Sequence, residues 1–221
     1  MRHLLQPRVL NQASIAGLLS ALACYPRLSL WLARPGPIWY LEATILVCCI
    51  MLWGFVFAWH TPYTNRPVFV LNWELAPFIA ATLTGIGSAA IYHLWVDPSL
   101  RPKLPEEYPP DLQHWLAAVP FVLALNQLLL IFAPFDWLIR LFKNRWVAAS
   151  LTALFGACVM MMKIHSLTTP VAPLLLAALL AARIVAVFLA VLFYLRGGVL
   201  LVWWWTLLFE SRHLLDIFGS H

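Results

Sequence analysis

Long apolar runs alternate with short polar, proline-containing breaks along most of this chain. A stretch such as TILVCCIMLWGFVFAW holds no charged residue, and a helix needs about 20 mostly apolar residues to cross the hydrocarbon core of a bilayer. The pattern predicts six membrane-spanning helices. Their expected limits are Ile38 to Trp59, Pro77 to Trp95, Trp115 to Phe132, Trp146 to Met162, Pro173 to Leu195 and Val199 to Phe209.

Two segments depart from this pattern. Residues 1–37 contain the apolar stretch ASIAGLLSALACYPRLSLWLA, which Pro26 and Arg27 interrupt, and we expect an interfacial or re-entrant helix there. Residues 97–114, DPSLRPKLPEEYPPDLQH, are polar and rich in proline, which predicts a stiff, extended loop. Neither segment forms a separate domain, so residues 1–221 are predicted to be a single integral membrane domain.

Composition supports the same fold class. Hydrophobic residues make up 63% of the 221 residues against 10% charged residues, and the mean hydropathy is +0.84, so a water-soluble globule would lack polar surface. The runs show no alternation of apolar and polar residues, which excludes an outer-membrane barrel. The prediction is an all-α, polytopic helical bundle.

The basic residues bear on partners and location. The net charge of +5 comes from residues scattered over the ends of the apolar runs rather than gathered on one polar face, so nucleic-acid binding is not expected. We expect a multi-pass protein of a bacterial inner membrane, in contact with the lipid bilayer. A small excess of lysine and arginine on the side that holds both chain ends favours termini in the cytoplasm.

Polar residues inside the apolar runs are candidates for function. Asn126 and Gln127 stand side by side in LALNQLLLIF, and we expect their amides to form hydrogen bonds across helices. Arg183 lies near the middle of another run, where an ionisable group needs a partner or a cavity. Glu42, Glu74 and Glu210 are its candidate carboxylate partners. The arginine either locks two helices together or binds an anionic substrate, lipid headgroup or cofactor.

Histidines supply candidate metal or cofactor ligands. Glu210 and His213 are three residues apart and share a helix face, and with His165 they could hold zinc through two histidines and a carboxylate. The alternative is an ordinary polar helix end at the lipid headgroups. His60 and His93 each lie at the end of a span, where haem or chlorin ligation is an option beside a simple interfacial role.

Small residues mark a candidate docking surface. Gly85 and Gly87 lie in AATLTGIGSAA, a small-residue stretch that lets another helix approach closely. This stretch predicts packing within the bundle or docking to a helix of another membrane protein.

Three segments between residues 120 and 212 resemble the motifs of a known family in order and spacing. NQLLLI, NRWVAASLTALFG and FYLRGGVLL are similar to the paired-glutamate, Phe-x-x-x-His and Tyr-Leu-Arg-Thr-Gly-Ser-like segments of the CAAX-protease and bacteriocin-processing (Abi) intramembrane metalloproteases. Phe155 matches the aromatic residue of the second motif. The resemblance implies the same helical scaffold.

At its catalytic positions the chain departs from that family. The substitutes are Asn126 and Gln127 for the two glutamates, Ile131 for the arginine, and Val159 and Leu207 for the two histidines. Amides keep the hydrogen-bonding capacity of glutamates but lose the charge that binds a metal or activates water. The resemblance therefore implies a scaffold that has lost the chemistry.

Three functions follow as expectations. The first is a non-catalytic membrane subunit or scaffold of a larger complex, such as one that carries pigments, haem or quinones. The second is an intramembrane metalloprotease-like enzyme with a displaced zinc site at His165, Glu210 and His213. The third is a small-molecule transporter in which Arg183 anchors the substrate.

Overall fold

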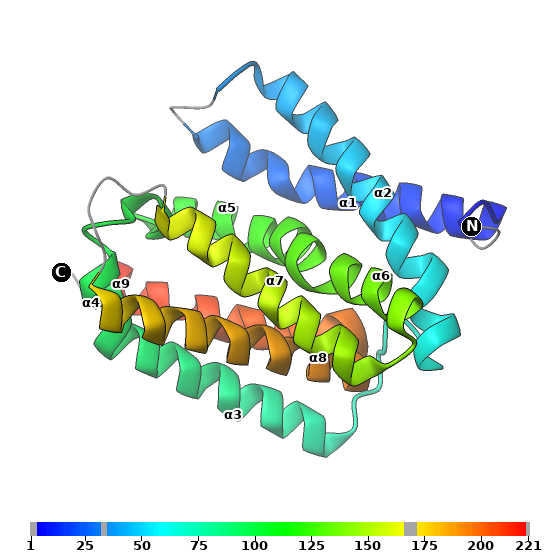
Figure 1. Ribbon diagram of the computed structural model, residues 1–221. Helices are drawn as coiled ribbons and strands as arrows, with labels where there is room; N and C mark the ends of the chain where they lie inside the picture. The colour runs from blue at the N-terminus through cyan, green and yellow to red at the C-terminus, as the bar shows by residue number, and fades with distance from the viewer. Residues whose placement is uncertain (1–3, 32–34, 166–171, 220–221) are drawn as a thin grey trace.

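The computed structural model describes residues 4–31, 35–165 and 172–219, and the regular secondary structure of this part of the chain is helical, without a β-sheet (Figure 1). Six of its helical segments are long and apolar enough to cross a membrane. The all-α polytopic bundle expected from the sequence is therefore confirmed. The helices are α1 (Pro7–Leu30), α2 (Ile38–Thr64), α3 (Leu75–Ile91), α4 (Asp97–Leu100), α5 (Leu112–Phe121), α6 (Ala133–Phe142), α7 (Arg145–His165), α8 (Pro173–Glu210) and α9 (Arg212–Gly219).

The N-terminal segment forms one continuous helix that lies beside α2 (Figure 1). The expected interruption at Pro26 does not occur: Pro26 lies inside α1, which continues to Leu30. With 24 residues, α1 is long and apolar enough to cross the bilayer rather than only rest on it. The start of α1 and the end of α9 lie at opposite ends of the bundle, unlike the expected arrangement with both termini on one side.

The proline-rich segment is more folded than the sequence suggested. Residues 97–114 were predicted to be an extended loop, but they hold the short helix α4, a 3₁₀ turn at Pro105–Glu107 and the first turn of α5. Asp111 caps α5 by accepting a hydrogen bond from the backbone N–H of His114 at 2.8 Å. This bond lowers the pKa of Asp111, which lies outside the membrane-spanning segments.

The span that contains Asn126 and Gln127 is longer than predicted. Helices α5 and α6 join through two π-helical stretches, Val122–Asn126 and Leu128–Phe132, into a run of 31 residues. Gln127 lies between the two stretches. π-helical turns inside α-helices are frequent at functional positions, because the wider turn re-aims the side chains around it.

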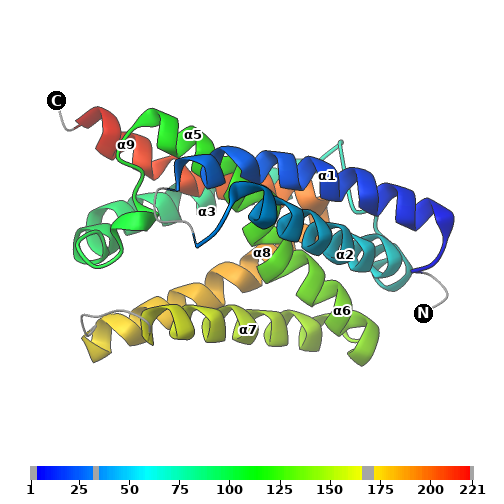
Figure 2. The same cartoon turned by 90° about the horizontal axis from the view of Figure 1, so that it is seen from above.

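Helix α8 reverses direction within its own length. Gly198 has φ 66° and ψ −165°, which ends the first arm, 173–197, and starts the second, 199–210. The rings of Phe193 and Trp205 lie 6.1 Å apart, whereas a straight helix would separate these residues by about 18 Å. Figures 1 and 2 show the two arms meeting at one end of the bundle and running back toward the other. The two last predicted spans are thus the arms of one helical hairpin.

A short extended segment holds this reversal in place. Val199 donates a backbone hydrogen bond to the carbonyl of Val68 at 2.9 Å, and Phe69 pairs with Gly198 as an isolated antiparallel bridge. The segment belongs to the connection between α2 and α3, so residues far apart in the chain close the turn together. The freed backbone groups at the break are satisfied in this way, as a bilayer environment requires.

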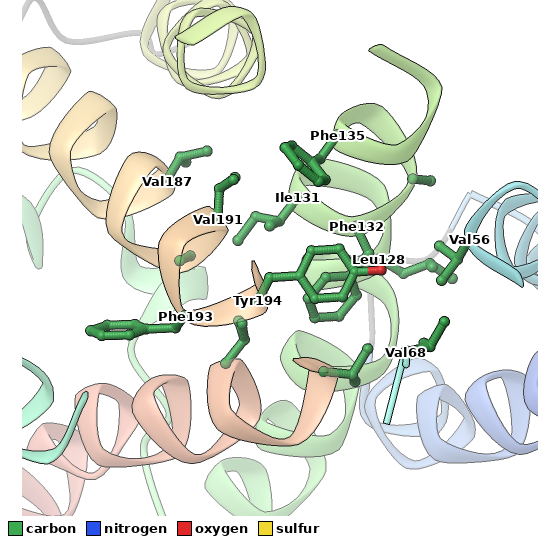
Figure 3. Close-up of a cluster of buried hydrophobic side chains, with 14 of the residues drawn as sticks. Val56, Val68, Leu128, Ile131, Phe132, Phe135, Val187, Val191, Phe193 and Tyr194 are labelled. Carbon is green, nitrogen blue, oxygen red and sulfur yellow. The ribbon is translucent and has the colours of Figure 1, made fainter. Parts of the chain in front are cut away.

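The core of the bundle forms where the arms of α8 meet α2, α6 and α7. Figure 3 shows Tyr194 extending from α8 toward Phe132, with Val56 of α2 on the far side. Buried aliphatic and aromatic side chains surround it, and α7 covers the face of the bundle opposite α1 (Figure 2). The three consecutive tryptophans after Val202 pack inward: Trp203 on Phe69, Trp204 on Phe78 and Trp205 on Phe193.

Candidate functional site

A buried triad of polar side chains lies inside this core. His60 comes from α2, Asp136 from α6 and Tyr194 from the first arm of α8. Nδ1 of His60 lies 2.9 Å from Oδ1 of Asp136, and the Tyr194 hydroxyl donates to Oδ2 of the same carboxylate at 2.7 Å. Three separate helices therefore meet at one carboxyl group.

The triad is closed to solvent. All three side chains are fully buried, and the ring of His60 lies 4.2 Å from that of Tyr194. Both oxygens of Asp136 are occupied, but Nε2 of His60 has no hydrogen-bond partner among the described residues. A carboxylate bonded to one nitrogen of a histidine fixes the orientation of the ring and leaves the other nitrogen available for proton transfer. Here that nitrogen faces the protein interior.

A second feature, the basic pocket, lies one helical turn from the triad. It has a volume of about 470 Å³ and opens where α2 ends, α7 begins and α8 reverses. Its lining includes Tyr63, Thr64, Asn65, Arg66, Glu74, Ile139, Arg145, Trp146, Leu192, Leu195 and Arg196. Three arginines from three different elements thus face one cavity that contains a single carboxylate.

The opposite end of the bundle carries a network of ion pairs. Arg212 binds Asp97 through Nε at 3.1 Å and lies over the ring of Phe209 at 4.0 Å. Tyr108 donates to the other oxygen of Asp97 at 2.9 Å. Burial and the neighbouring charge of Asp97 raise the pKa of the Tyr108 phenol well above its usual range, so it remains a donor. Asp97 is 1% exposed, and these bonds compensate its burial.

This network includes two of the three predicted zinc ligands, Glu210 and His213. Glu210 lies 3.5 Å from Nε2 of His213 and 3.6 Å from Arg212. The first two ligands are therefore neighbours, as their spacing indicated. However, within the described residues no three histidine, cysteine, aspartate or glutamate side chains gather in a group that could hold a metal ion, and His165 does not join the pair.

Arg183 lies close to the same network. None of the three carboxylates predicted as partners forms an ion pair with Arg183 among the described residues, and Glu210 and Glu107, the second of which the sequence did not single out, act on it only over a longer range. Glu74 lines the basic pocket at the other end. The Arg183 guanidinium also passes close to α7, with Nε 3.7 Å from the position that a Cβ would take on Gly156.

The two amides differ in their surroundings. Gln127 donates a hydrogen bond from Nε2 to the hydroxyl of Thr206 at 2.9 Å, which joins α5–α6 to the second arm of α8. The cross-helix bond expected of Gln127 is thus present, whereas the described residues offer no such bond to Asn126.

Most of the remaining predicted residues lie beside other residues of the chain. A Cβ on Gly85 would lie 3.1 Å from the Leu208 side chain, so this glycine docks α3 on the second arm of α8. Gly87 faces open space instead. His93 lies 3.5 Å from Asp216 without a hydrogen bond from its Nδ1, and His60 belongs to the buried triad, so each histidine that was considered as a haem or chlorin ligand has a carboxylate beside it.

Two of the three residues of the buried triad were not identified from the sequence. Asp136 and Tyr194 were not singled out, because the predicted spans ended at Phe132 and Leu195 and placed neither residue beside His60. A carboxylate in APFDWLIRLF, directly after an apolar run, was the available signal. The three arginines of the basic pocket are far apart in the sequence, with at least one long helix between each pair, and they come together only in the folded chain.

Together these features define a multi-pass helical membrane protein with a polar triad buried in its apolar core and a basic pocket at one end. Comparison with protein-family models, with curated proteins and with solved structures gives no significant match. The similarity to the Abi metalloproteases remains a prediction from the motifs.

Proposed function

We propose that this protein is a non-catalytic integral membrane scaffold, a subunit around which a larger membrane complex assembles. The observation that carries the proposal is that polar groups inside the bundle are used to join its own helices. Gln127 bonds Thr206, Trp204 donates to Thr82 at 3.0 Å, and Trp53 donates to Ser20 at 2.8 Å. Cross-helix hydrogen bonds of this kind stabilise membrane bundles.

The resemblance to the Abi family supports a loss of catalysis. At the position of the catalytic glutamates, Gln127 uses its amide N–H as a donor to Thr206, and a carboxylate could not make this bond. The substitution thus supports a structural contact at a former catalytic position.

Helix α3 supports the role as a subunit. It packs against α8 through Gly85, while Leu83, Ile86 and Gly87 on its other side point away from the bundle. A Cβ on Gly87 would meet nothing within 4 Å, so another helix can approach the backbone closely there.

Purification from the native membrane in a gentle detergent tests the proposal. We expect a complex larger than the 25.1 kDa chain, with protein partners identifiable by mass spectrometry. An absorption spectrum of the same peak tells whether the complex carries a pigment, haem or quinone. The proposal would be contradicted if the chain were recovered alone. In that case the Gly87→Leu variant and the wild-type protein would also have the same apparent size.

The Gln127–Thr206 bond gives a direct test of the structural use of the amide. We expect a double-mutant cycle with Gln127→Leu and Thr206→Val to give a coupling free energy of about 0.6 kcal/mol, the average for hydrogen bonds between membrane helices, and at most about 1.7 kcal/mol. The free energy of unfolding is measured by titrating the protein from mild detergent into sodium dodecyl sulfate. Asn126→Leu is the matched control and should show no coupling to Thr206→Val.

The metalloprotease-like alternative has one observation in its favour, the contact between Glu210 and His213. Because Arg212 also binds Glu210, we expect purified protein to contain no stoichiometric zinc after dialysis against zinc-containing buffer. Metal analysis by mass spectrometry measures this directly. One bound zinc per chain that disappears in His213→Ala would favour the enzyme over the scaffold.

A further inference from the structure

We propose that the basic pocket binds a phosphate group, and that the pocket is a specific recognition site for a phosphate-bearing anion at the membrane surface. This inference does not depend on the scaffold role. Its basis is the convergence of Arg66, Arg145 and Arg196 on one cavity of about 470 Å³.

Each arginine reaches the pocket because a helix ends or turns there. Arg66 follows Asn65, which terminates α2 with a left-handed φ of 56°. Arg145 is the first residue of α7, after Lys143 with a φ of 52°. Arg196 precedes the reversal of α8 by two residues. Three independent backbone terminations thus place cationic side chains around the same space.

The charges of the pocket are not neutralised within the described chain. Arg66, Arg145, Arg196 and Glu74 form no ion pair with a described residue, and three positive charges face one negative charge. At the other end of the bundle three basic residues have acidic partners: Arg101 binds Asp216, Arg212 binds Asp97 and Lys163 binds Glu107. An excess of unpaired positive charge in a cavity attracts an anion. The ion pairs at the other end of the bundle leave no such excess on these residues, and in this respect the pocket differs from that end.

The residue types indicate phosphate. Guanidinium groups match the oxygens of a phosphate with paired, charge-assisted hydrogen bonds, and several arginines around one cavity suit a group with oxygens on all sides. Thr64 and Asn65 add neutral polar groups, and Glu74 can accept a bond from a hydroxyl of the ligand. The volume exceeds that of a phosphate ion, which leaves room for an attached polar group.

The position suggests the source of the phosphate. The pocket lies at the ends of apolar helices, and its wall includes Tyr63 and Trp146, aromatic residues that favour the headgroup level of a bilayer. Trp146 is 53% exposed, and Leu192 and Leu195 form an apolar part of the wall. A phospholipid headgroup and a soluble phosphate ester share the phosphate, and the experiment separates them.

The test uses the full chain in micelles of dodecyl maltoside, a non-ionic detergent without phosphate, and measures the intrinsic tryptophan fluorescence and the melting temperature. Phosphatidylglycerol is added as a lipid in one arm, and glycerol phosphate as a soluble ester in the other. We expect Arg66→Gln, Arg145→Gln and Arg196→Gln each to weaken binding about tenfold, which corresponds to about 1.4 kcal/mol. Arg196→Lys keeps the positive charge but not the paired N–H donors of arginine, so it should weaken binding less than Arg196→Gln.

Lys143→Asn is the matched control, since it removes a positive charge from the same end of the bundle outside the pocket. Asparagine also tolerates the left-handed backbone at this position. Binding of phosphatidylglycerol alone identifies a lipid headgroup, and binding of glycerol phosphate as well shows that the phosphate suffices. Absence of binding in both arms, or equal weakening by Lys143→Asn and the arginine variants, would overturn the proposal.

Discussion

Replacing Gly198 with alanine is expected to destabilise the protein more than any other single-methyl change in the described chain. A residue with φ 66° and ψ −165° lies in a region that is essentially restricted to glycine, and a side chain there costs about 1–3 kcal/mol. The added Cβ would also lie 2.4 Å from the carbonyl oxygen of Val68, which adds about 1–3 kcal/mol of overpacking. We expect a total loss of about 2–6 kcal/mol in the free energy of unfolding.

The measurement is unfolding in mixed detergent micelles, followed by circular dichroism during titration with sodium dodecyl sulfate. Gly87→Ala is the matched control, because a Cβ on Gly87 meets no atom within 4 Å and its backbone is helical. Alanine should stabilise α3 there by about 0.5–1 kcal/mol in the isolated chain. If Gly198→Ala unfolded at the same detergent fraction as the wild type, the tight reversal of α8 would be wrong.

Asp136→Ala is the second change with a large expected effect. It removes the carboxyl group that binds both His60 and Tyr194, and it leaves two polar groups buried without their partner. Removing one member of a buried polar pair costs about 3–5 kcal/mol, and we expect a loss in this range. Unfolding is measured in the same detergent titration.

Two further variants make this prediction specific. Tyr194→Phe deletes a single hydroxyl that donates to Asp136 and should cost about 1.5–3 kcal/mol, less than Asp136→Ala. Glu106→Ala removes an exposed carboxylate from the segment before α5 and should change stability by less than about 0.5 kcal/mol. Equal stability of Asp136→Ala and Glu106→Ala would show that the triad does not hold the helices together.

The membrane helices could be predicted from the sequence because the bilayer imposes a length and a composition that a single helix must satisfy locally. The predicted ranges from Ile38 to Trp59 and from Trp146 to Met162 lie within α2 and α7. The interruption before Val199 was also predicted, since the last two spans were placed at Pro173 to Leu195 and Val199 to Phe209.

The buried triad could not be predicted in the same way. His60 and Asp136 are 76 residues apart, and Asp136 and Tyr194 are 58 apart, so their contact depends on how whole helices pack. The sequence placed Asp136 beyond the end of a span, but the structure continues that helix to Phe142 and buries the carboxylate. Arg183 is a second example. Its position deep in a membrane span was predicted from the sequence, but its proximity to the charge of Glu107 depends on the fold and was not predicted.

The reversal of α8 also has a consequence for biosynthesis. A membrane segment is normally released from the translocation machinery when a polar loop follows it, but residues 197 and 198 are both glycines and the apolar sequence continues directly into Val199. We expect the two arms to enter the bilayer together as one hairpin rather than one after the other. The segment that holds Val68 is synthesised before this hairpin, and its carbonyl can accept the first free backbone N–H of the second arm when the hairpin folds.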